Sequence, residues 1–331
     1  MMELLDCTLR DGSNVVGAGF SREMTVTILE SLVKCGIRAI EMGHSSGLGG
    51  NEGGGKKAPL SDEEYMEIAS PYLKKAEIGM FCQPKLATEN KLRHAAQAGL
   101  GFLRVGINAG DSSRATDLIR QIRGYGMKVR TSLMKAYVLS AEELAEEARK
   151  LEAAGAGGVT IMDSAGHMTP EEVKDYVAAL KKALSIPVGF HGHNNLGLAV
   201  ANGLAAWRAG AASIDCGIMG MARSVGNIPT EAVIAVLQRF GEASEYDLHA
   251  LLSSIDLDIM PPLKSLFHNP IPPVELVLGK AGCHSNFLPM FRDVASERGV
   301  DLYSLIIGVS ELDRKAPTRE LIVSVAERMA H

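Results

Sequence analysis

The amino-acid sequence predicts an α/β protein, a (β/α)8 TIM barrel with a C-terminal helical appendage. Short apolar runs rich in Val and Ile alternate with amphipathic stretches of helical length, and the alternation repeats eight times before it ends near residue 240. This regular alternation is typical of parallel α/β folds, and a count of eight favours a closed barrel. A Rossmann fold is the alternative, but no GxGxxG motif follows the first strand. We therefore expect a catalytic barrel over residues 1–242 and a helical domain over residues 243–331.

The elements follow in a regular order along the chain. The predicted strands are Leu4–Leu9, Ala39–Gly43, Ile78–Phe81, Phe102–Ile107, Val129–Leu133, Gly158–Asp163, Val188–His193 and Ser213–Ile218. Three capping boxes mark helix starts between strands: Ser61 with Glu64, Ser140 with Glu143, and Thr169 with Glu172. Each cap lies between a strand and the helical period that follows it, so these positions are expected to be βα junctions.

The composition bounds the function. The chain has 331 residues, 46% of them hydrophobic, and its net charge of -5 comes from interspersed acids and bases. Nucleic acid and anionic membranes are therefore not expected partners. Five cysteines are scattered without a CxxC motif, which fits free thiols in a reducing compartment. No signal-peptide pattern and no apolar run of roughly 18 residues occurs, so we expect a soluble, cytoplasmic protein.

One loop, residues 43–57, is unusually rich in glycine. Five of its last nine residues are glycine, so it should be rigid only with a partner or a ligand. A phosphate cradle is one interpretation, but the GKS/T signature is absent. A mobile lid over the barrel mouth is the favoured interpretation. His44, at the base of this loop, is placed to face the site.

After Glu242 the alternation ends and helical patterns take over. We expect helices near Tyr246–Ile255 and Pro289–Arg298, separated by proline-rich segments. Between the prolines and the second helix lies a stretch of glycines and polar residues, 279–287, that contains His284. It is interpreted either as a backbone that closes over the barrel mouth or as a plain interhelical loop.

Two histidines carry the chemistry of the seventh strand. His191 and His193 are two residues apart, so on a strand their side chains point to the same side. Asp11 follows the first strand, at the rim where barrel active sites are built. Two imidazoles and one carboxylate leave open metal positions for a bidentate substrate, and they suit Mn²⁺, Mg²⁺, Co²⁺, Zn²⁺ or Fe²⁺. A pair of hydrogen-bonded histidines, or the metal triad of an Fe(II) oxygenase, are the alternatives.

Arg10 stands beside the predicted metal aspartate. A guanidinium offers several fixed donors to a carboxylate or an enolate oxygen. A metal together with Arg10 would polarise a carbonyl group and stabilise an enolate. The alternative role is a structural salt bridge to Asp11 or to another acid of the rim.

These residues together carry a family resemblance. Residues 8–12 (TLRDG), His44, Arg104, Asp163 with Ser164, residues 191–196 (HGHNNL) and Gly226 with Asn227 resemble the DRE-TIM metallolyases, and among them the 4-hydroxy-2-oxovalerate aldolases. The similarity extends to residues 220–231 and to residues 281–288 of the appendage. It implies a divalent metal held by Asp11, His191 and His193, with Mn²⁺ the first choice and Mg²⁺, Co²⁺ or Zn²⁺ as alternatives. It also implies pyruvate or another 2-oxoacid on that metal, with Arg10 on the enolate oxygen and Ser164, His44 and Arg104 as substrate-binding residues.

Two positions depart from these aldolases where protons must move. Asn14 stands in place of a histidine, and His284 stands in place of a tyrosine of the appendage. A neutral amide cannot be a general base near pH 7, whereas an imidazole can. We expect His284 to handle the hydroxyl proton, with Asn14 orienting a hydroxyl group or water. A different substrate is the other interpretation, because the acyl-CoA branches of the superfamily carry a glutamine near this position.

The sequence thus predicts a carbon–carbon lyase, a divalent-metal-dependent aldolase that cleaves or forms a 4-hydroxy-2-oxoacid through a metal-bound pyruvate enolate. Its small-molecule partners are a 2-oxoacid and an aldehyde. The resemblance adds a homo-oligomer and an acylating aldehyde dehydrogenase as expected protein partners. An acyl-CoA-dependent lyase or synthase is the first alternative, and a non-catalytic metal-binding subunit of an aldehyde dehydrogenase is the second.

Overall fold

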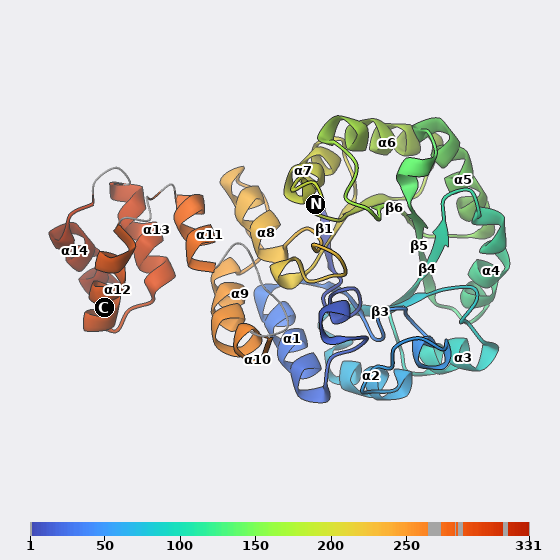
Figure 1. Cartoon of the computed structure of the whole chain (residues 1–331), viewed down its shortest axis with the longest axis horizontal. Coiled ribbons are helices and arrows are strands. Elements are labelled where there is room, and N and C mark those ends of the chain that lie inside the picture. The colour runs from blue at the N-terminus through green and yellow to red at the C-terminus, as the bar shows by residue number, and fades with distance from the viewer. Residues whose placement is uncertain (1, 264–272, 282, 284–286, 314–316, 331) are drawn as a thin grey trace.

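Eight parallel strands close into a barrel in sequence order, as predicted (Figure 1). The structure is a computed structural model that describes residues 2–263, 273–281, 283, 287–313 and 317–330, with only the backbone at 275, 276, 279 and 280. In this part of the chain the strands are β1 (Glu3–Asp6), β2 (Ala39–Met42), β3 (Glu77–Cys82), β4 (Phe102–Asn108), β5 (Lys128–Met134), β6 (Val159–Asp163), β7 (Val188–Gly192) and β8 (Ser213–Cys216). Pairing of β1 with β8 closes the barrel.

Each strand is followed by a helix that covers the outside of the barrel (Figure 1). These helices are α1 (Arg22–Cys35), α2 (Asp62–Ala69), α3 (Glu89–Gln97), α4 (Thr116–Gly124), α5 (Ala141–Ala154), α6 (Pro170–Ala183), α7 (Ala199–Arg208) and α8 (Thr230–Arg239). The three predicted capping boxes are confirmed at the starts of α2, α5 and α6. The main apolar core lies between the strands and this ring of helices.

The first and last strands end earlier than expected. After Asp6, the backbone N–H groups of Arg10, Asp11 and Gly12 all donate to the carbonyl oxygen of Cys7, which turns the chain out of β1. After β8, the N–H of Ile218 donates to the hydroxyl of Thr8 instead of continuing the ladder. Both changes have one consequence: the predicted ends of these strands form the turns that present the site.

A helical appendage follows α8, as expected, with the predicted boundary at residue 242 falling between α8 and α9. Its described helices are α9 (Leu248–Ser254), the π-helix η7 (Ile255–Ile259), α10 (Met260–Leu263), α11 (Pro273–Ala281), α12 (Leu288–Arg298), α13 (Leu302–Leu312) and α14 (Arg319–Met329). In Figure 1 they lie beside the barrel, where α9 packs on α1 and α8, and α11 packs on α8 and α13. Closure of the appendage over the barrel mouth remains a prediction. Among the described helices, none is both long and apolar enough to cross a membrane.

Candidate active site

Asp11, His191 and His193 meet at the C-terminal rim of the barrel. His191 lies in β7, His193 follows it directly, and Asp11 lies in the turn after β1. One Asp11 oxygen, Oδ2, is 3.7 Å from Nε2 of His191 and 3.8 Å from Nε2 of His193. The three donor atoms lie within 4.8 Å of one another, and all three side chains are buried. The arrangement therefore offers a carboxylate and two imidazoles to one central point.

The protonation states suit a divalent cation. Burial would raise the pKa of Asp11, but Arg10 and the two imidazoles hold that pKa well below its usual range. Burial and the neighbouring His191 lower the pKa of His193 to about 4, so its ring is neutral at pH 7. Metal ligands must be a charged carboxylate and neutral imidazoles, so this donor set fits the ion that the resemblance implies.

Asp215 orients the first of these histidines. Its Oδ2 lies 3.1 Å from Nδ1 of His191, on the side of the ring away from Asp11. Although burial opposes ionisation, Arg104 and His191 bring the pKa of Asp215 down to about 2. A carboxylate on Nδ1 selects the tautomer with the proton on that nitrogen, which leaves the lone pair of Nε2 facing Asp11.

Two asparagines position the aspartate itself. The Nδ2 of Asn227 donates to Oδ2 of Asp11 at 2.9 Å. The Nδ2 of Asn14 donates to the backbone oxygen of Asp11 at 2.8 Å and lies 3.3 Å from its Oδ1. Asn14 is thus brought to the site as a hydrogen-bond donor, and its contacts are with a metal-ligand candidate.

Arg10 is fixed by two carboxylates and an aromatic ring. Its Nε donates to Oε1 of Glu41 at 2.5 Å, and its Nη1 lies 3.0 Å from Oδ1 of Asp11. The guanidinium carbon stands 4.8 Å from the centre of the Phe81 ring. Among the described residues, the remaining nitrogen, Nη2, is buried and has no hydrogen-bond partner. One oriented donor of Arg10 is therefore left for a group that the chain does not supply.

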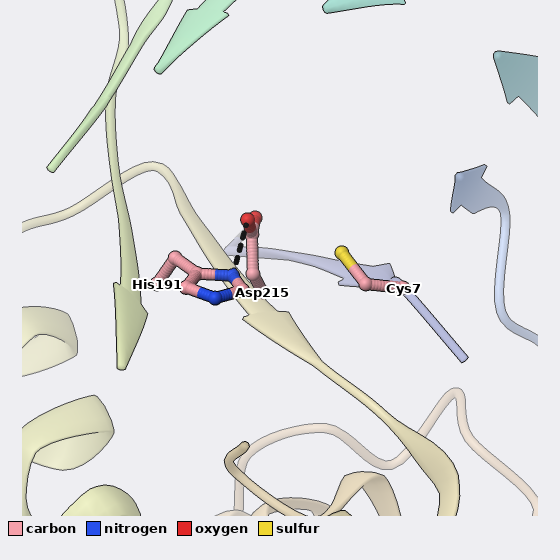
Figure 2. A group of neighbouring side chains, drawn as sticks. All are labelled: Cys7, His191 and Asp215. Atoms are coloured by element: carbon pink, nitrogen blue, oxygen red, sulfur yellow. Dashed lines mark hydrogen bonds and ion pairs between the residues drawn. The ribbon is translucent and has the colours of Figure 1, made fainter. Parts of the chain in front are cut away.

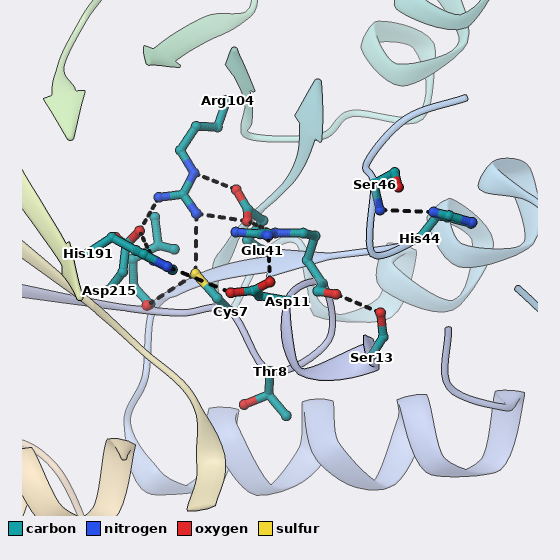
Figure 3. A network of polar contacts seen from close by, with 12 residues as sticks. Cys7, Thr8, Asp11, Ser13, Glu41, His44, Ser46, Arg104, His191 and Asp215 are labelled. Carbon is teal, nitrogen blue, oxygen red and sulfur yellow. Dashed lines mark hydrogen bonds and ion pairs between the residues drawn. The ribbon is translucent and has the colours of Figure 1, made fainter. Parts of the chain in front are cut away.

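Arg104 lies deeper in the barrel, with its donors turned to protein groups (Figure 3). Its guanidinium contacts three buried side chains: Glu41, Asp215 and Cys7. Glu41 thereby bridges Arg10 and Arg104, and Arg104 connects it to the carboxylate that orients His191. The structure thus brings Arg104 into the network under the site, and substrate contact by this residue remains a prediction.

A second set of donors, Cys7, His191 and Asp215, also clusters in the barrel (Figure 2). Here a cation is already present, because Nη1 of Arg104 contacts Asp215 and its Nη2 lies 3.2 Å from Sγ of Cys7. Burial raises the pKa of the Cys7 thiol well above its usual range, so it stays protonated. A neutral thiol is a poor metal ligand, so this set serves the arginine.

The glycine-rich loop, residues 43–57, is held by contacts between its own residues. Nδ1 of His44 accepts from the N–H of Ser46, and Nε2 lies 2.9 Å from the carbonyl oxygen of Lys56. Both ring nitrogens of His44 therefore hold the loop (Figure 3 shows the bond to Ser46). Gly50 packs against this ring so closely that a Cβ there would lie 2.2 Å from Nδ1. The roles of a lid for the loop and of a substrate contact for His44 remain predictions.

Ser164 follows β6 at the same rim. Its Oγ accepts from the backbone N–H of Lys135 at 2.9 Å, and a hydroxyl that accepts one hydrogen bond can still donate its hydrogen to another group. His284 lies outside the described residues, so its predicted role as the base stays a prediction. His167, another histidine of the rim, is exposed and its ring lies 5.5 Å from that of Tyr137.

Sequence reasoning assigned no role to four residues of this network: Glu41, Phe81, Asp215 and Asn227. Two of them carried a signal, because Glu41 and Asp215 are acids inside otherwise apolar strand patterns. A charge in such a run needs a buried partner. Asn227 belonged to the family motif, whereas nothing in the local pattern distinguished Phe81 from an ordinary core side chain.

Known proteins resemble the chain over nearly its whole length. The family model described as HMGL-like matches residues 1–257. A 4-hydroxy-2-oxovalerate aldolase of Geobacillus genomosp. 3 is 33% identical over 99% of this chain and 97% of its own. The enzyme of that name from Carboxydothermus hydrogenoformans is 34% identical, with the same two shares covered.

Solved structures agree on the fold. An HMG-CoA lyase of Bacillus subtilis superposes with a TM-score of 0.68 at 17% identity, over 82% of this chain and 97% of that one. The carboxyl transferase domain of Rhizobium etli pyruvate carboxylase gives 0.67 at 16% identity, over 99% of this chain and 60% of that one. With the family model and the aldolase relatives, these findings confirm the sequence resemblance: the chain belongs to the HMGL-like family, within the DRE-TIM metallolyases, and is a carbon–carbon lyase of that class.

Proposed function

We propose that the protein is a divalent-metal-dependent aldolase that cleaves or forms a 4-hydroxy-2-oxoacid through the enolate of pyruvate. The observation that carries the proposal is the metal-donor set of Asp11, His191 and His193 beside the unpartnered Nη2 of Arg10. The aldolase relatives, whose names specify 4-hydroxy-2-oxovalerate, support the same substrate class.

Asp11, His191 and His193 would hold the metal. When bound, the divalent ion would act as a Lewis acid on the carbonyl group of the 2-oxoacid. Mn²⁺ is the proposed ion because one carboxylate and two imidazoles combine hard and borderline ligands, with Mg²⁺, Co²⁺ and Zn²⁺ as alternatives. The hydrogen bonds from Asn227 and to Asp215 would keep Asp11 and His191 in the binding orientation.

Arg10 would stabilise the negative charge that forms on the enolate oxygen. Its orientation is set before substrate arrives, because Glu41 and Asp11 hold two of its nitrogens and Phe81 lies against its face. A preorganised donor costs little reorganisation when charge develops, and this is where such donors contribute most to catalysis. The negative charges of Glu41 and Asp11 raise the pKa of Arg10 although burial opposes it, so the guanidinium stays charged.

Three further residues complete the proposed chemistry. Ser164 would donate its hydroxyl hydrogen to the substrate carboxylate, because its oxygen already accepts from Lys135. Asn14 would orient the reacting hydroxyl group or a water molecule beside Asp11. His284 would take the hydroxyl proton as the general base, since an amide at position 14 cannot accept it.

The alternatives receive less support. An acyl-CoA-dependent lyase or synthase shares the barrel, but the HMG-CoA lyase superposes at only 17% identity. A non-catalytic metal-binding subunit would need the metal donors but not Arg10, whose Nη2 is left without a hydrogen-bond partner among the described residues. A homo-oligomer, an acylating aldehyde dehydrogenase partner and a cytoplasmic location remain part of the proposal; the five cysteines are buried and free, as in a reducing compartment.

One assay separates these functions. The Mn²⁺-loaded protein is incubated with pyruvate and a panel of aldehydes, and in parallel with pyruvate or a 2-oxoacid and acyl-CoA donors, and the products are identified by mass. We expect 4-hydroxy-2-oxoacids from the first set and no CoA release from the second. Product formation only with acyl-CoA donors would replace the proposed function by the first alternative, and absence of product in both sets would favour the non-catalytic subunit.

A further inference from the structure

Arg223 stands at the open side of the metal-donor set. It lies in the turn between β8 and α8, its Nε is 4.0 Å from Oδ1 of Asp11, and 64% of its side chain is exposed. Among the described residues, this long ion pair is the one polar contact found for the guanidinium of Arg223. Its side chain is mostly exposed beside the metal-donor set, whereas Arg10 and Arg104 are buried and held by carboxylates.

The backbone around Arg223 is held in an unfavourable conformation. Ser224 has φ of 59°, in the left-handed region that residues other than glycine seldom adopt. Its hydroxyl accepts from Nδ2 of Asn195 at 2.9 Å, and the N–H of Asn194 donates to the carbonyl oxygen of Gly226 at 2.9 Å. These bonds tie the turn to the loop after β7, which carries His193. The turn is therefore fixed relative to the metal donors, and Arg223 projects from a positioned segment.

The charges beneath Arg223 are balanced without it. The buried charged groups that pair with one another at the metal-donor set are three carboxylates and two arginines: Asp11, Glu41 and Asp215 with Arg10 and Arg104. Together they have one negative charge in excess, and an imidazole that binds a metal ion is neutral. A divalent ion leaves one positive charge, which the carboxylate of a 2-oxoacid neutralises. Before the enolate forms, Arg223 thus adds a positive charge beyond the requirement of the bound 2-oxoacid.

We propose that Arg223 binds an anionic group on the aldehyde half of the substrate, so that the preferred aldehyde carries a carboxylate or a phosphate away from its carbonyl group. This inference rests on the proposed aldolase function and specifies its substrate class. A guanidinium pairs with either anion through two parallel hydrogen bonds. Its Nε lies 4.0 Å from Asp11 and its side chain is 64% exposed, so an anion on the second substrate could reach it beside a 2-oxoacid bound among Asp11, His191 and His193.

The kinetic test compares aldehydes of equal length with and without the anion. Butanal is paired with succinic semialdehyde, and glyceraldehyde with its 3-phosphate. We expect kcat/KM of wild type to favour an anionic member, and Arg223→Gln to reduce that preference by about tenfold, mainly through KM. Arg223→Lys should keep part of it. Arg120→Gln, which removes an exposed arginine of α4, is the matched control.

A binding measurement is independent of turnover. 2-Oxoglutarate and 2-oxopentanoate have the same chain length and lack the 4-hydroxyl group that cleavage requires. Calorimetry on the Mn²⁺-loaded protein should show tighter binding of the dicarboxylate to wild type and to Arg120→Gln, and equal binding of both to Arg223→Gln. Equal binding to wild type, or an unchanged preference in Arg223→Gln, overturns the inference.

The two proposals fail in different ways. If neutral aldehydes react but Arg223→Gln changes no preference between paired aldehydes, the inference fails and the aldolase function stands. If Arg223→Gln raises KM for pyruvate equally with every aldehyde, Arg223 binds the 2-oxoacid carboxylate and the inference is again wrong. If no aldehyde reacts, the proposed function fails, while the calorimetric comparison still decides whether Arg223 recognises a second anion.

Discussion

At the scale of single residues, Asp215 acts on the metal through His191. Asp215→Asn replaces the carboxylate that fixes the Nδ1–H tautomer of His191, so both tautomers become accessible. We expect Mn²⁺ affinity to fall by about 10- to 100-fold, the usual effect of losing such a partner. Calorimetric titration of the metal-free wild type and variant with Mn²⁺ measures the two affinities.

The control for this prediction is another buried carboxylate. Asp62 accepts from the N–H of Gly49 and from Lys91, away from the metal donors. Asp62→Asn should lower thermal stability without changing Mn²⁺ affinity. If both variants bind the metal as wild type does, Asp215 has only a structural role in pairing with Arg104.

Arg10 permits a second test at this scale. Arg10→Lys keeps a positive charge near Glu41 but removes the planar fork that directs Nη2 away from both carboxylates. We expect metal binding to persist while kcat for aldol cleavage falls about 100- to 1,000-fold, the scale of a lost preorganised donor. Single-turnover kinetics and metal titration on one preparation separate the two effects. Near-normal turnover of Arg10→Lys would mean that Arg10 has a purely structural role.

At the scale of elements, β3 and β4 pack so that an aromatic ring lies beneath the site. Phe81 of β3 extends over Gly106 of β4, where a Cβ would lie 1.9 Å from Cζ of the ring. The same ring supports Arg10 at 4.8 Å and lies 6.0 Å from the guanidinium carbon of Arg104. The missing side chain at position 106 thus provides the space for a platform under the arginine that faces the substrate.

The two positions should therefore depend on each other. Gly106→Ala would displace the Phe81 ring and with it Arg10, and a shift of about 1 Å in such a group can cost about 100-fold in rate. Leucine at position 81 does not reach Gly106, so Phe81→Leu with Gly106→Ala should react about as fast as Phe81→Leu alone. Measured kcat values for the four proteins test this. Multiplicative losses in the double variant would show that Gly106 acts independently of the ring.

Much of the element order was predictable because hydrophobic period and helix caps are local signals. All eight strands and the three capping boxes follow from residues within a few positions of each other. The end of β1 was placed too late, since three N–H groups converge on Cys7 instead of entering the ladder. The roles of Glu41 and Asp215 depend on contacts with Arg104, which arise only when distant strands close the barrel.

The residues of the candidate site also fall into two groups, those that local sequence patterns predict and those whose contacts arise only in the folded barrel. Asp11, Arg10, His191 and His193 could be selected from motif spacing, and the structure brings them together at one rim. His44 lies at the predicted loop, but its ring nitrogens contact that loop's own backbone, a partner that spacing does not reveal. Arg104 lies among carboxylates of β2 and β8, because strand alternation directs its side chain into the barrel.

At the scale of the whole molecule, two buried carboxylates lie where the barrel closes. Asp6 at the end of β1 accepts from the hydroxyl of Thr230 in α8, and Glu231 accepts from the N–H of Met219 after β8. Met219 has φ of 56°, so this bond holds a strained turn. Burial raises the pKa of Asp6 to about 6 and that of Glu231 to about 7. The contact between β1 and α8, and the turn after β8, thus depend on acids that are difficult to ionise.

The sign of the resulting pH dependence follows from linkage. Because Glu231 has a higher pKa in the folded state than its ordinary value of 4.5, the folded state binds more protons between pH 4.5 and about 7. Its contribution to stability is therefore lost as pH rises through that window. The difference corresponds to at most about 3 kcal/mol. Asp11 and Asp215, whose pKa values are lowered, act in the opposite direction and oppose unfolding at neutral pH.

Glu231→Gln should remove this penalty while keeping an oxygen for the N–H of Met219. We expect the variant to be more stable than wild type at pH 8, by on the order of 1–3 kcal/mol, and to lose most of that advantage at pH 4.5 to 5. Urea unfolding of the metal-free proteins across this range measures the difference, and Glu142→Gln, on the exposed face of α5, controls for loss of an ordinary carboxylate. A pH-independent difference between Glu231→Gln and wild type would mean that Glu231 is ionised or protonated equally in the folded and unfolded chain. Its hydrogen bond to Met219, not its proton, would then be what it contributes to the turn after β8.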